Sequence, residues 1–293
     1  MPESWVWCIE RNKRNWDGCN NDCSKNHSKA LVKKSKSTIA ATGICHYNTR
    51  PSIHLITLMP HATLLKYPGT NCDAETARAL QLVGFTTAIV PIADASVSDI
   101  EKSQLVMFSG GFSYGDYVMS GRLAQLVTES KLGDAIQNHH ARGGFTFGIC
   151  NGFQILTKLG ILPTGSLIDN TTERFVCRWA TLQVKNSSSP YLQGLPEQFE
   201  LPVAHAEGRF VTFPGDAESY LANGNVALTY AENFNGSTLS IAGLQDPTGR
   251  AFGLMPHPER FIQKNHHYDP DWNLTPDFGW GYYMFKSLAS ALA

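Results

Sequence analysis

The pentapeptide at residues 148–152, Gly-Ile-Cys-Asn-Gly, carries the side chain best suited to act as a nucleophile, the thiol of Cys150. An apolar run at 145–149 leads into it, and a helical pattern follows at 151–159. This is the form of a strand–turn–helix elbow, with cysteine where many hydrolases carry serine. The glycines permit a strained, closely packed turn, and the amides that open the helix favour the thiolate. We expect Cys150 to be catalytic; the alternative is an inert cysteine in a tight turn.

A general base for this nucleophile is offered by His257, within the segment Met-Pro-His-Pro-Glu-Arg at 255–260. The flanking prolines exclude a helix and favour extended chain, in which residues two apart point to the same side. Glu259 is then placed to accept the Nδ1 proton of His257 and to leave Nε2 for the sulfur. We therefore expect a catalytic triad of Cys150, His257 and Glu259. The histidine pairs at 139–140 and 266–267 are interpreted as surface or core residues.

An oxyanion site is expected where the apolar run at 105–108 ends in Ser-Gly-Gly-Phe-Ser-Tyr-Gly-Asp. Paired glycines at a strand end let the backbone approach a ligand closely. The predicted substrate-binding and oxyanion residues are Gly110, Gly111, Phe112 and Asn151, whose main-chain N–H groups would stabilise a tetrahedral intermediate. A simple loop is the alternative. No phosphate-binding loop motif is present, so the sequence predicts no ATP site in this chain. No other cofactor site and no metal site is predicted.

Strands that alternate with helices must position these motifs. The apolar patterns predict strands at 62–67, 86–92, 105–108 and 145–149, and helices at 73–83, 98–102, 129–142 and 151–159. Further strands are expected at 174–184, 226–230, 240–244 and 251–255, and a closing helix at 279–293. This order predicts an α/β fold: a mostly parallel sheet with helices on both faces and some added antiparallel strands.

The charge and composition divide the chain near residue 58. Residues 1–58 carry nine Lys and Arg against four Asp and Glu and show no sustained apolar period, which predicts a basic, disordered leader. Four of the seven cysteines lie there, but their spacing matches no familiar zinc motif. Met59 precedes the first strand, so a mis-assigned start is the alternative. Residues 59–293 are expected to form the catalytic domain.

The bulk composition excludes several other classes of protein. The formal net charge of −1 gives no electrostatic footprint for nucleic acid, and no apolar run approaches the roughly 18–20 residues that span a bilayer. The scattered cysteines do not suit a secreted disulfide scaffold. A cytoplasmic enzyme without nucleic-acid or membrane partners is expected.

Taken together, the Gly-Gly turn, the cysteine elbow and the late His-Pro-Glu resemble a class I (triad) glutamine amidotransferase domain, from about Thr63 to the C-terminus. Longer stretches at 67–73, 110–116, 148–154, 204–210 and 255–260 resemble the glutaminase subunits of phosphoribosylformylglycinamidine synthases. The resemblance implies a flavodoxin-like sheet. It also implies that Cys150 attacks the side-chain amide of L-glutamine and forms a thioester, which water then hydrolyses.

The same resemblance implies a partner. Ammonia would pass to an ATP-dependent synthase subunit of de novo purine synthesis, which uses ATP and Mg²⁺ in its own active site, and a small third subunit is an open question. Three alternatives stay open: a glutaminase for GMP, CTP or carbamoyl phosphate synthesis, a related cysteine hydrolase, or a binding subunit without turnover. The roles of His205 and Glu207, and whether the oxyanion site forms before the partner docks, also stay open.

Overall fold

The structure, a computed structural model, describes residues 59–293. The predictions for residues 1–58, including the basic leader and its cysteines, lie outside the described residues. Within the described part of the chain, no helix is both long enough and apolar enough to cross a membrane.

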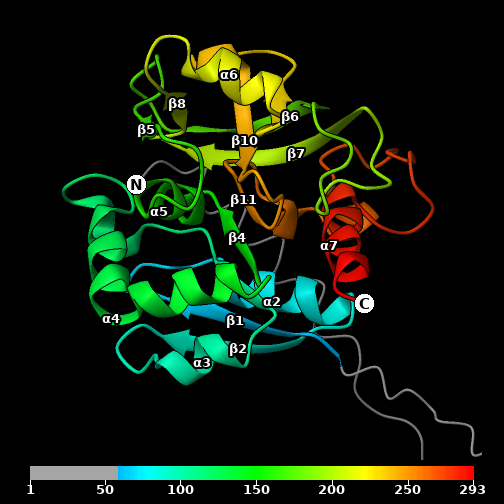
Figure 1. The fold of residues 1–293 in the computed structure, drawn as a ribbon. Coiled ribbons are helices and arrows are strands. Elements are labelled where there is room, and N and C mark those ends of the chain that lie inside the picture. Colours follow the sequence, from blue (N-terminus) through cyan, green and yellow to red (C-terminus); the bar gives the residue numbers. More distant parts are fainter. Residues whose placement is uncertain (1–58) are drawn as a thin grey trace, which may run out of the picture. The chain divides into compact units, whose positions relative to one another are not determined.

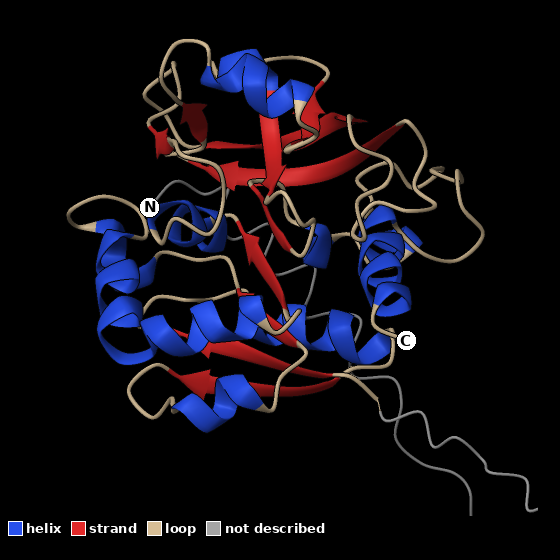
Figure 2. Ribbon diagram, in the orientation of Figure 1, coloured by secondary structure: helices blue, strands red, loops and turns tan. Residues whose placement is uncertain are grey.

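Five parallel strands make up one half of a nine-stranded sheet (Figures 1 and 2). Their spatial order is β2 (Thr86–Pro91), β1 (His61–Lys66), β3 (Leu105–Phe108), β4 (Phe145–Ile149) and β11 (Ala251–Leu254). Counting β11 as the fifth strand, this is the 2-1-3-4-5 order of flavodoxin-like sheets, which bind ligands at the carboxyl ends of their strands. The predicted fold class is confirmed.

Antiparallel strands extend the sheet beyond β11. They follow in the order β10 (Ile241–Gln245), β9 (Val226–Tyr230), β6 (Val176–Val184) and β7 (Gln198–His205). A separate two-stranded sheet pairs β5 (Ser166–Ile168) with β8 (Arg209–Val211). Strand β7 was not predicted, although its buried residues alternate with less buried ones, as the period-two rule requires.

Helices lie on both sides of the parallel strands, as Figure 2 shows. They are α2 (Asp73–Leu82), α3 (Val97–Glu101), α4 (Arg122–Ala141), α5 (Asn151–Lys158), α6 (Asp216–Ala222) and α7 (Trp280–Ala291). Short 3₁₀ turns are η1 (Ser113–Asp116), η2 (Thr238–Ser240), η3 (Pro258–Arg260) and η4 (Lys264–His266). The predicted start of α4 at residue 129 is wrong. Its first two turns bury the polar side chains of Gln125 and Thr128, so the apolar period misses them.

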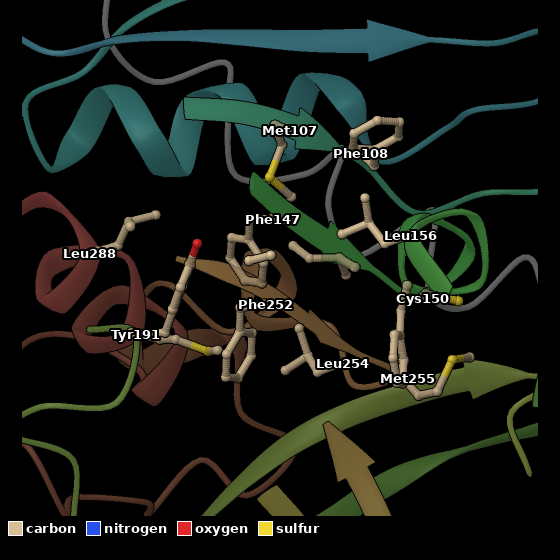
Figure 3. Close-up of a cluster of buried hydrophobic side chains, with 14 of the residues drawn as sticks. Met107, Phe108, Phe147, Cys150, Leu156, Tyr191, Phe252, Leu254, Met255 and Leu288 are labelled. Atoms are coloured by element: carbon tan, nitrogen blue, oxygen red, sulfur yellow. The ribbon is translucent and has the colours of Figure 1, made fainter. Parts of the chain in front are cut away.

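The hydrophobic core fills the space between the parallel strands and the helices that cover them (Figure 3). Phe147, Tyr191 and Phe252 pack ring against ring, with centroids 4.6 to 5.7 Å apart. The buried hydroxyl of Tyr191 donates to the carbonyl oxygen of Arg250 at 2.7 Å, so its polar atom is satisfied. Cys150 lies at the margin of this cluster, where β4 ends, and its side chain packs against the core.

Candidate active site

Cys150 occupies a strained turn between β4 and α5. Its φ of 52° and ψ of −107° lie outside the regions that a residue with a Cβ ordinarily adopts. Two hydrogen bonds hold the turn: the N–H of Cys150 donates to the carbonyl of Leu254 at 2.8 Å, and its carbonyl accepts from Gln154 at 3.2 Å. The side chain is 6% exposed. The elbow therefore presents the thiol at the carboxyl edge of the sheet, at the N-terminus of α5.

The glycine at position 152 is required by close packing. A Cβ on Gly152 would lie 1.9 Å from the carbonyl oxygen of Phe108, where α5 crosses the end of β3. Gly148 is also confined, because a Cβ there would lie 2.7 Å from the backbone of Gly152. Because glycine has no Cβ, α5 can pack against the end of β3 closely enough to hold Cys150 in place.

His257 and Glu259 come to the same edge from the end of β11. Nδ1 of His257 lies 2.6 Å from Oε1 of Glu259, and both residues are buried. His257 is held by its own N–H, which donates to the carbonyl of Pro202 at 2.8 Å. The pair forms through the 3₁₀ turn η3, which contains Glu259, rather than through the fully extended chain that the prolines suggested.

The electrostatics of this pair favour an imidazolium beside a carboxylate. Burial and the charge of Arg260 lower the pKa of His257, but the charges of Glu259 and Cys150 outweigh them, so the pKa lies well above its ordinary value. Burial raises the pKa of Glu259, whereas His257 and Arg260 lower it, and the net direction is down. The raised pKa of His257 favours transfer of a thiol proton to the imidazole.

The cysteine and the histidine converge across the sheet edge. A Cβ on Gly110 would lie 2.9 Å from Cε1 of His257 and 3.5 Å from Cβ of Cys150, so both side chains border the same small space above β3. Among the described residues, no oxygen or nitrogen atom is bonded to Nε2 of His257, and the nearby thiol of Cys150 contributes to the raised pKa of this histidine. The sulfur of Cys150 also lies 3.8 Å from the carbonyl oxygen of Ala204, at the end of β7. The antiparallel half of the sheet thus forms one wall of the site.

The predicted oxyanion residues lie together but differ in what they offer. The N–H of Phe112 donates to the carbonyl of Gly69 at 3.0 Å and is therefore occupied. Neither Gly111 nor Asn151 directs its N–H to an acceptor within the described residues. The carbonyl of Gly110 accepts the N–H groups of Asn71 and Cys72 at 3.3 and 3.2 Å, which fixes the turn after β3. Two donors, one from each loop, remain for a ligand.

The side chain of Asn151 joins the two loops that carry these donors. Its Oδ1 accepts the N–H of Ser113 at 3.2 Å, and its Nδ2 donates to Gln154 at 2.9 Å and to Asp116 at 3.4 Å. The side chain of Asn151 therefore ties the elbow to the turn after β3. Asn151 is thus held by its side chain at the place where the sequence predicts an oxyanion donor.

His205 and Glu207 lie beside the site in different roles. Nδ1 of His205 contacts Oδ1 of Asn170 at 3.1 Å, and burial, with the charge of His257, lowers its pKa to about 3, so its ring is neutral near pH 7. Glu207 accepts the N–H of Ser120 at 3.1 Å, and its carbonyl accepts from Gln154 at 2.6 Å. Glu207 therefore fastens the turn after β7 to α5 and to the loop before α4.

The sequence analysis missed two residues at the site, Cys72 and Arg260. Nη2 of Arg260 lies 3.0 Å from the sulfur of Cys72, and its Nε contacts Glu75 at 3.3 Å. Cys72 follows β1, whose carboxyl end adjoins that of β3. The signal that could have revealed it is the strand order, because neighbouring parallel strands bring their following loops together.

These features define a class of protein: an α/β enzyme fold with a buried cysteine on a strand–helix turn, facing a His–Glu pair at the carboxyl edge of a parallel sheet. The family model for the CobB/CobQ-like glutamine amidotransferase domain matches residues 59–290. The chain belongs to this family of glutamine amidotransferases.

Individual relatives agree with this assignment. The chain is 37% identical over 209 residues to the phosphoribosylformylglycinamidine synthase subunit PurQ of Thermotoga maritima, covering 71% of this chain and 91% of that protein. It is 40% identical over 226 residues to PurQ of Dehalococcoides mccartyi, covering 71% of this chain and 88% of that one. A chain from the structure of PurLQS from Thermotoga maritima superposes with a TM-score of 0.67 at 34% identity, covering 80% of this chain and all of that one.

Proposed function

We propose that this chain is the glutaminase subunit of phosphoribosylformylglycinamidine synthase. It hydrolyses L-glutamine to glutamate and ammonia, and it delivers the ammonia to an ATP-dependent synthase subunit of purine biosynthesis. The main support for the proposed reaction is that Cys150 lies close to the hydrogen-bonded pair of His257 and Glu259 in a buried site. The similarity to two PurQ proteins, over about nine-tenths of their length, supports the assignment to purine biosynthesis.

In the first half-reaction, the sulfur of Cys150 attacks the carbonyl carbon of the glutamine side chain. His257 takes the thiol proton and returns it to the leaving nitrogen, so that ammonia departs and a thioester remains. Glu259 accepts the Nδ1 hydrogen of His257 at 2.6 Å and stabilises the imidazolium that forms. In the second half-reaction, His257 takes a proton from water and the resulting hydroxide attacks the thioester carbon. The sulfur leaves, His257 returns the proton to it, and glutamate departs.

Both half-reactions pass through a tetrahedral intermediate with a negative oxygen. The N–H groups of Gly111 and Asn151 are the donors that remain for it, because that of Phe112 is bonded to Gly69. Each donor of this kind contributes about 3–4 kcal/mol of transition-state stabilisation in enzymes that use one. Docking of the synthase subunit could free the third donor, so we expect low turnover by the isolated subunit.

The proposal also covers the cellular setting. The chain itself needs no cofactor for this chemistry, and ATP and Mg²⁺ belong to the synthase subunit. We place the activity in the cytoplasm. Cys72 and Cys150, both buried, form no disulfide, which suits a reducing compartment.

The test is release of glutamate from L-glutamine by the full chain, with and without the synthase subunit, its formylglycinamide ribonucleotide substrate and ATP. The expected result is turnover that the synthase stimulates and that a Cys150→Ala variant abolishes. Cys177→Ala, which removes an exposed thiol of β6, is the matched control and should keep wild-type turnover. Stimulation by a GMP, CTP or carbamoyl phosphate synthase instead would assign the ammonia to that pathway. A folded protein without turnover in any mixture would refute the glutaminase.

A further inference from the structure

Two buried polar residues at the carboxyl edge of the sheet have no part in the hydrolysis described above. They are His205, the last residue of β7, and Tyr230, the last residue of β9. Both strands run in the direction of β4. Strand β11 is parallel to β4, the chain direction reverses at β10 and again at β9, and it reverses twice more at β6 and β7. His205 and Tyr230 therefore end their strands at the edge where Cys150 follows β4.

The hydrogen bonds around Asn170 determine which nitrogen of His205 carries the hydrogen. Nδ2 of Asn170 donates to the carbonyl oxygens of Arg174 and His205, both at 2.9 Å, so its Oδ1 is an acceptor. Nδ1 of His205 lies 3.1 Å from this oxygen and must be the donor, so Nε2 carries a lone pair. Among the described residues, Nε2 has no hydrogen-bond partner, and the residue is 3% exposed. His205 thus presents a buried acceptor.

The hydroxyl of Tyr230 is likewise buried without a hydrogen-bond partner among the described residues, and Tyr230 is 2% exposed. A phenol hydroxyl can donate one hydrogen bond and accept others. Buried polar atoms in proteins are normally hydrogen-bonded, to the protein itself or to a bound molecule. His205 and Tyr230 together therefore offer an acceptor and a donor to a small polar ligand.

Both residues lie close to the catalytic triad. The carbonyl oxygen of Ala204, which precedes His205, lies 3.8 Å from the sulfur of Cys150. Burial and then the charge of Cys150 raise the pKa of Tyr230. Burial and then the charge of His257 lower the pKa of His205 to about 3. Each of the two residues is therefore within electrostatic range of the groups that release ammonia.

Ammonia is the reaction product that this pair suits. Its N–H groups match the Nε2 acceptor of His205, and its lone pair matches the hydroxyl donor of Tyr230. Neither residue converts ammonia to ammonium, because the pKa of His205 is lowered and that of Tyr230 is raised. The apolar ring of Phe234 packs against both, with centroids 5.9 Å from His205 and 4.8 Å from Tyr230. Such surroundings favour the neutral molecule over the ion.

We propose that Nε2 of His205 and the hydroxyl of Tyr230 bind the ammonia released at Cys150 and hold it for transfer to the synthase subunit. His257 returns its proton to the leaving nitrogen, and the electron pair of the C–N bond stays on that nitrogen as it departs. One N–H then donates to His205, and the lone pair accepts the hydrogen of the Tyr230 hydroxyl. This inference rests on the proposed function and assigns the first binding site of its product.

The test uses the full chain assembled with the synthase subunit, its formylglycinamide ribonucleotide substrate, ATP and L-glutamine. Amidine, glutamate and free ammonia are measured, and the amidine formed per glutamate reports the share of ammonia that is transferred. Tyr230→Phe removes only the hydroxyl, and His205→Asn removes the Nε2 acceptor but keeps a donor for Asn170. In both variants we expect this ratio to fall about three- to tenfold, the effect of one neutral hydrogen bond, while free ammonia rises.

Tyr191→Phe is the matched control, because it removes the hydroxyl of a buried core tyrosine that donates to the carbonyls of Arg250 and Thr146. This variant should transfer ammonia like the wild type but unfold at a lower urea concentration. Tyr230→Phe gives up no hydrogen bond within the described residues, so its urea midpoint should not be lower than that of the wild type. Ammonium chloride, which bypasses glutamine, should support the same synthase rate in every complex.

A wild-type ratio of amidine to glutamate in Tyr230→Phe or in His205→Asn would overturn the proposal. A lower urea midpoint for Tyr230→Phe would also overturn it, because the hydroxyl would then have a structural role, and a matching loss of the rate with ammonium chloride would place the defect in subunit docking. If circular dichroism shows His205→Asn to be unfolded, Tyr230→Phe alone decides. A wild-type complex that releases no glutamate would refute the proposed function, whereas normal glutamate release with an unchanged ratio refutes only the ammonia site.

Discussion

Gly152 is the position at which the smallest substitution should do the most damage to the site. A methyl group on this residue would lie 1.9 Å from the carbonyl oxygen of Phe108, 2.7 Å from its carbonyl carbon and 2.9 Å from its Cβ. Cβ atoms in proteins essentially never approach another heavy atom within 3.0 Å. In a Gly152→Ala variant, α5 must therefore move away from β3 by at least about 1 Å.

The size of the effect follows from this displacement. Overpacking of a well-packed core costs typically about 1–3 kcal/mol, so the free energy of unfolding should fall by about that amount. The same movement carries Cys150, which precedes α5, away from His257. A misplacement of about 1 Å can cost about 100-fold in rate, so we expect kcat for glutamine hydrolysis to fall about 100-fold while the protein remains folded.

Gly133→Ala is the matched control. Gly133 lies inside α4, and a methyl group there would have no neighbour within 4 Å. Alanine is a better helix former than glycine by about 0.5–1 kcal/mol, so this variant should be slightly more stable and fully active. Chemical denaturation and the glutaminase assay are run on both variants and the wild type. Wild-type turnover and stability in Gly152→Ala would refute the close-packing argument for the elbow.

Two further predictions concern the buried histidines. Glu259→Gln removes a carboxylate that raises the pKa of His257, so this pKa should fall. We expect kcat to fall about 100- to 10,000-fold and the acid limb of the pH–rate profile to move to lower pH. A rate within threefold of wild type would contradict this role. The pKa of His205 is about 3 in the folded protein, against 6.5 for an exposed histidine. As the pH falls below 6.5, the unfolded chain therefore takes up a proton that the folded protein does not. The free energy of unfolding should therefore fall by about 2 kcal/mol between pH 7 and pH 5 because of this residue. His205→Asn, which keeps a donor for Asn170, should abolish that part of the loss in urea titrations, and an unchanged pH dependence would contradict it.

Local spacing determined much of the site. The glycines at 148 and 152 and the prolines around His257 restrict the backbone through steric effects within a few residues, so the elbow and the proximity of Glu259 could be read from the chain. The strands at 105–108 and 145–149 were predicted with the observed bounds, since continuous apolar runs mark buried parallel strands. For the same reason the α/β class followed from the alternation of strands and helices.

Long-range geometry decided the rest. Strand order cannot be derived from apolar periodicity, because every buried strand shows the same pattern whichever neighbour it pairs with. Only the placement of β1 beside β3 and of β11 beside β4 brings Cys72 next to His257 across 185 residues of chain. The use of the Phe112 N–H by Gly69 was equally beyond the sequence, since a donor's partner depends on which loop the sheet lays beside it. The sequence specified the reactive groups, and the tertiary structure decided which of them meet.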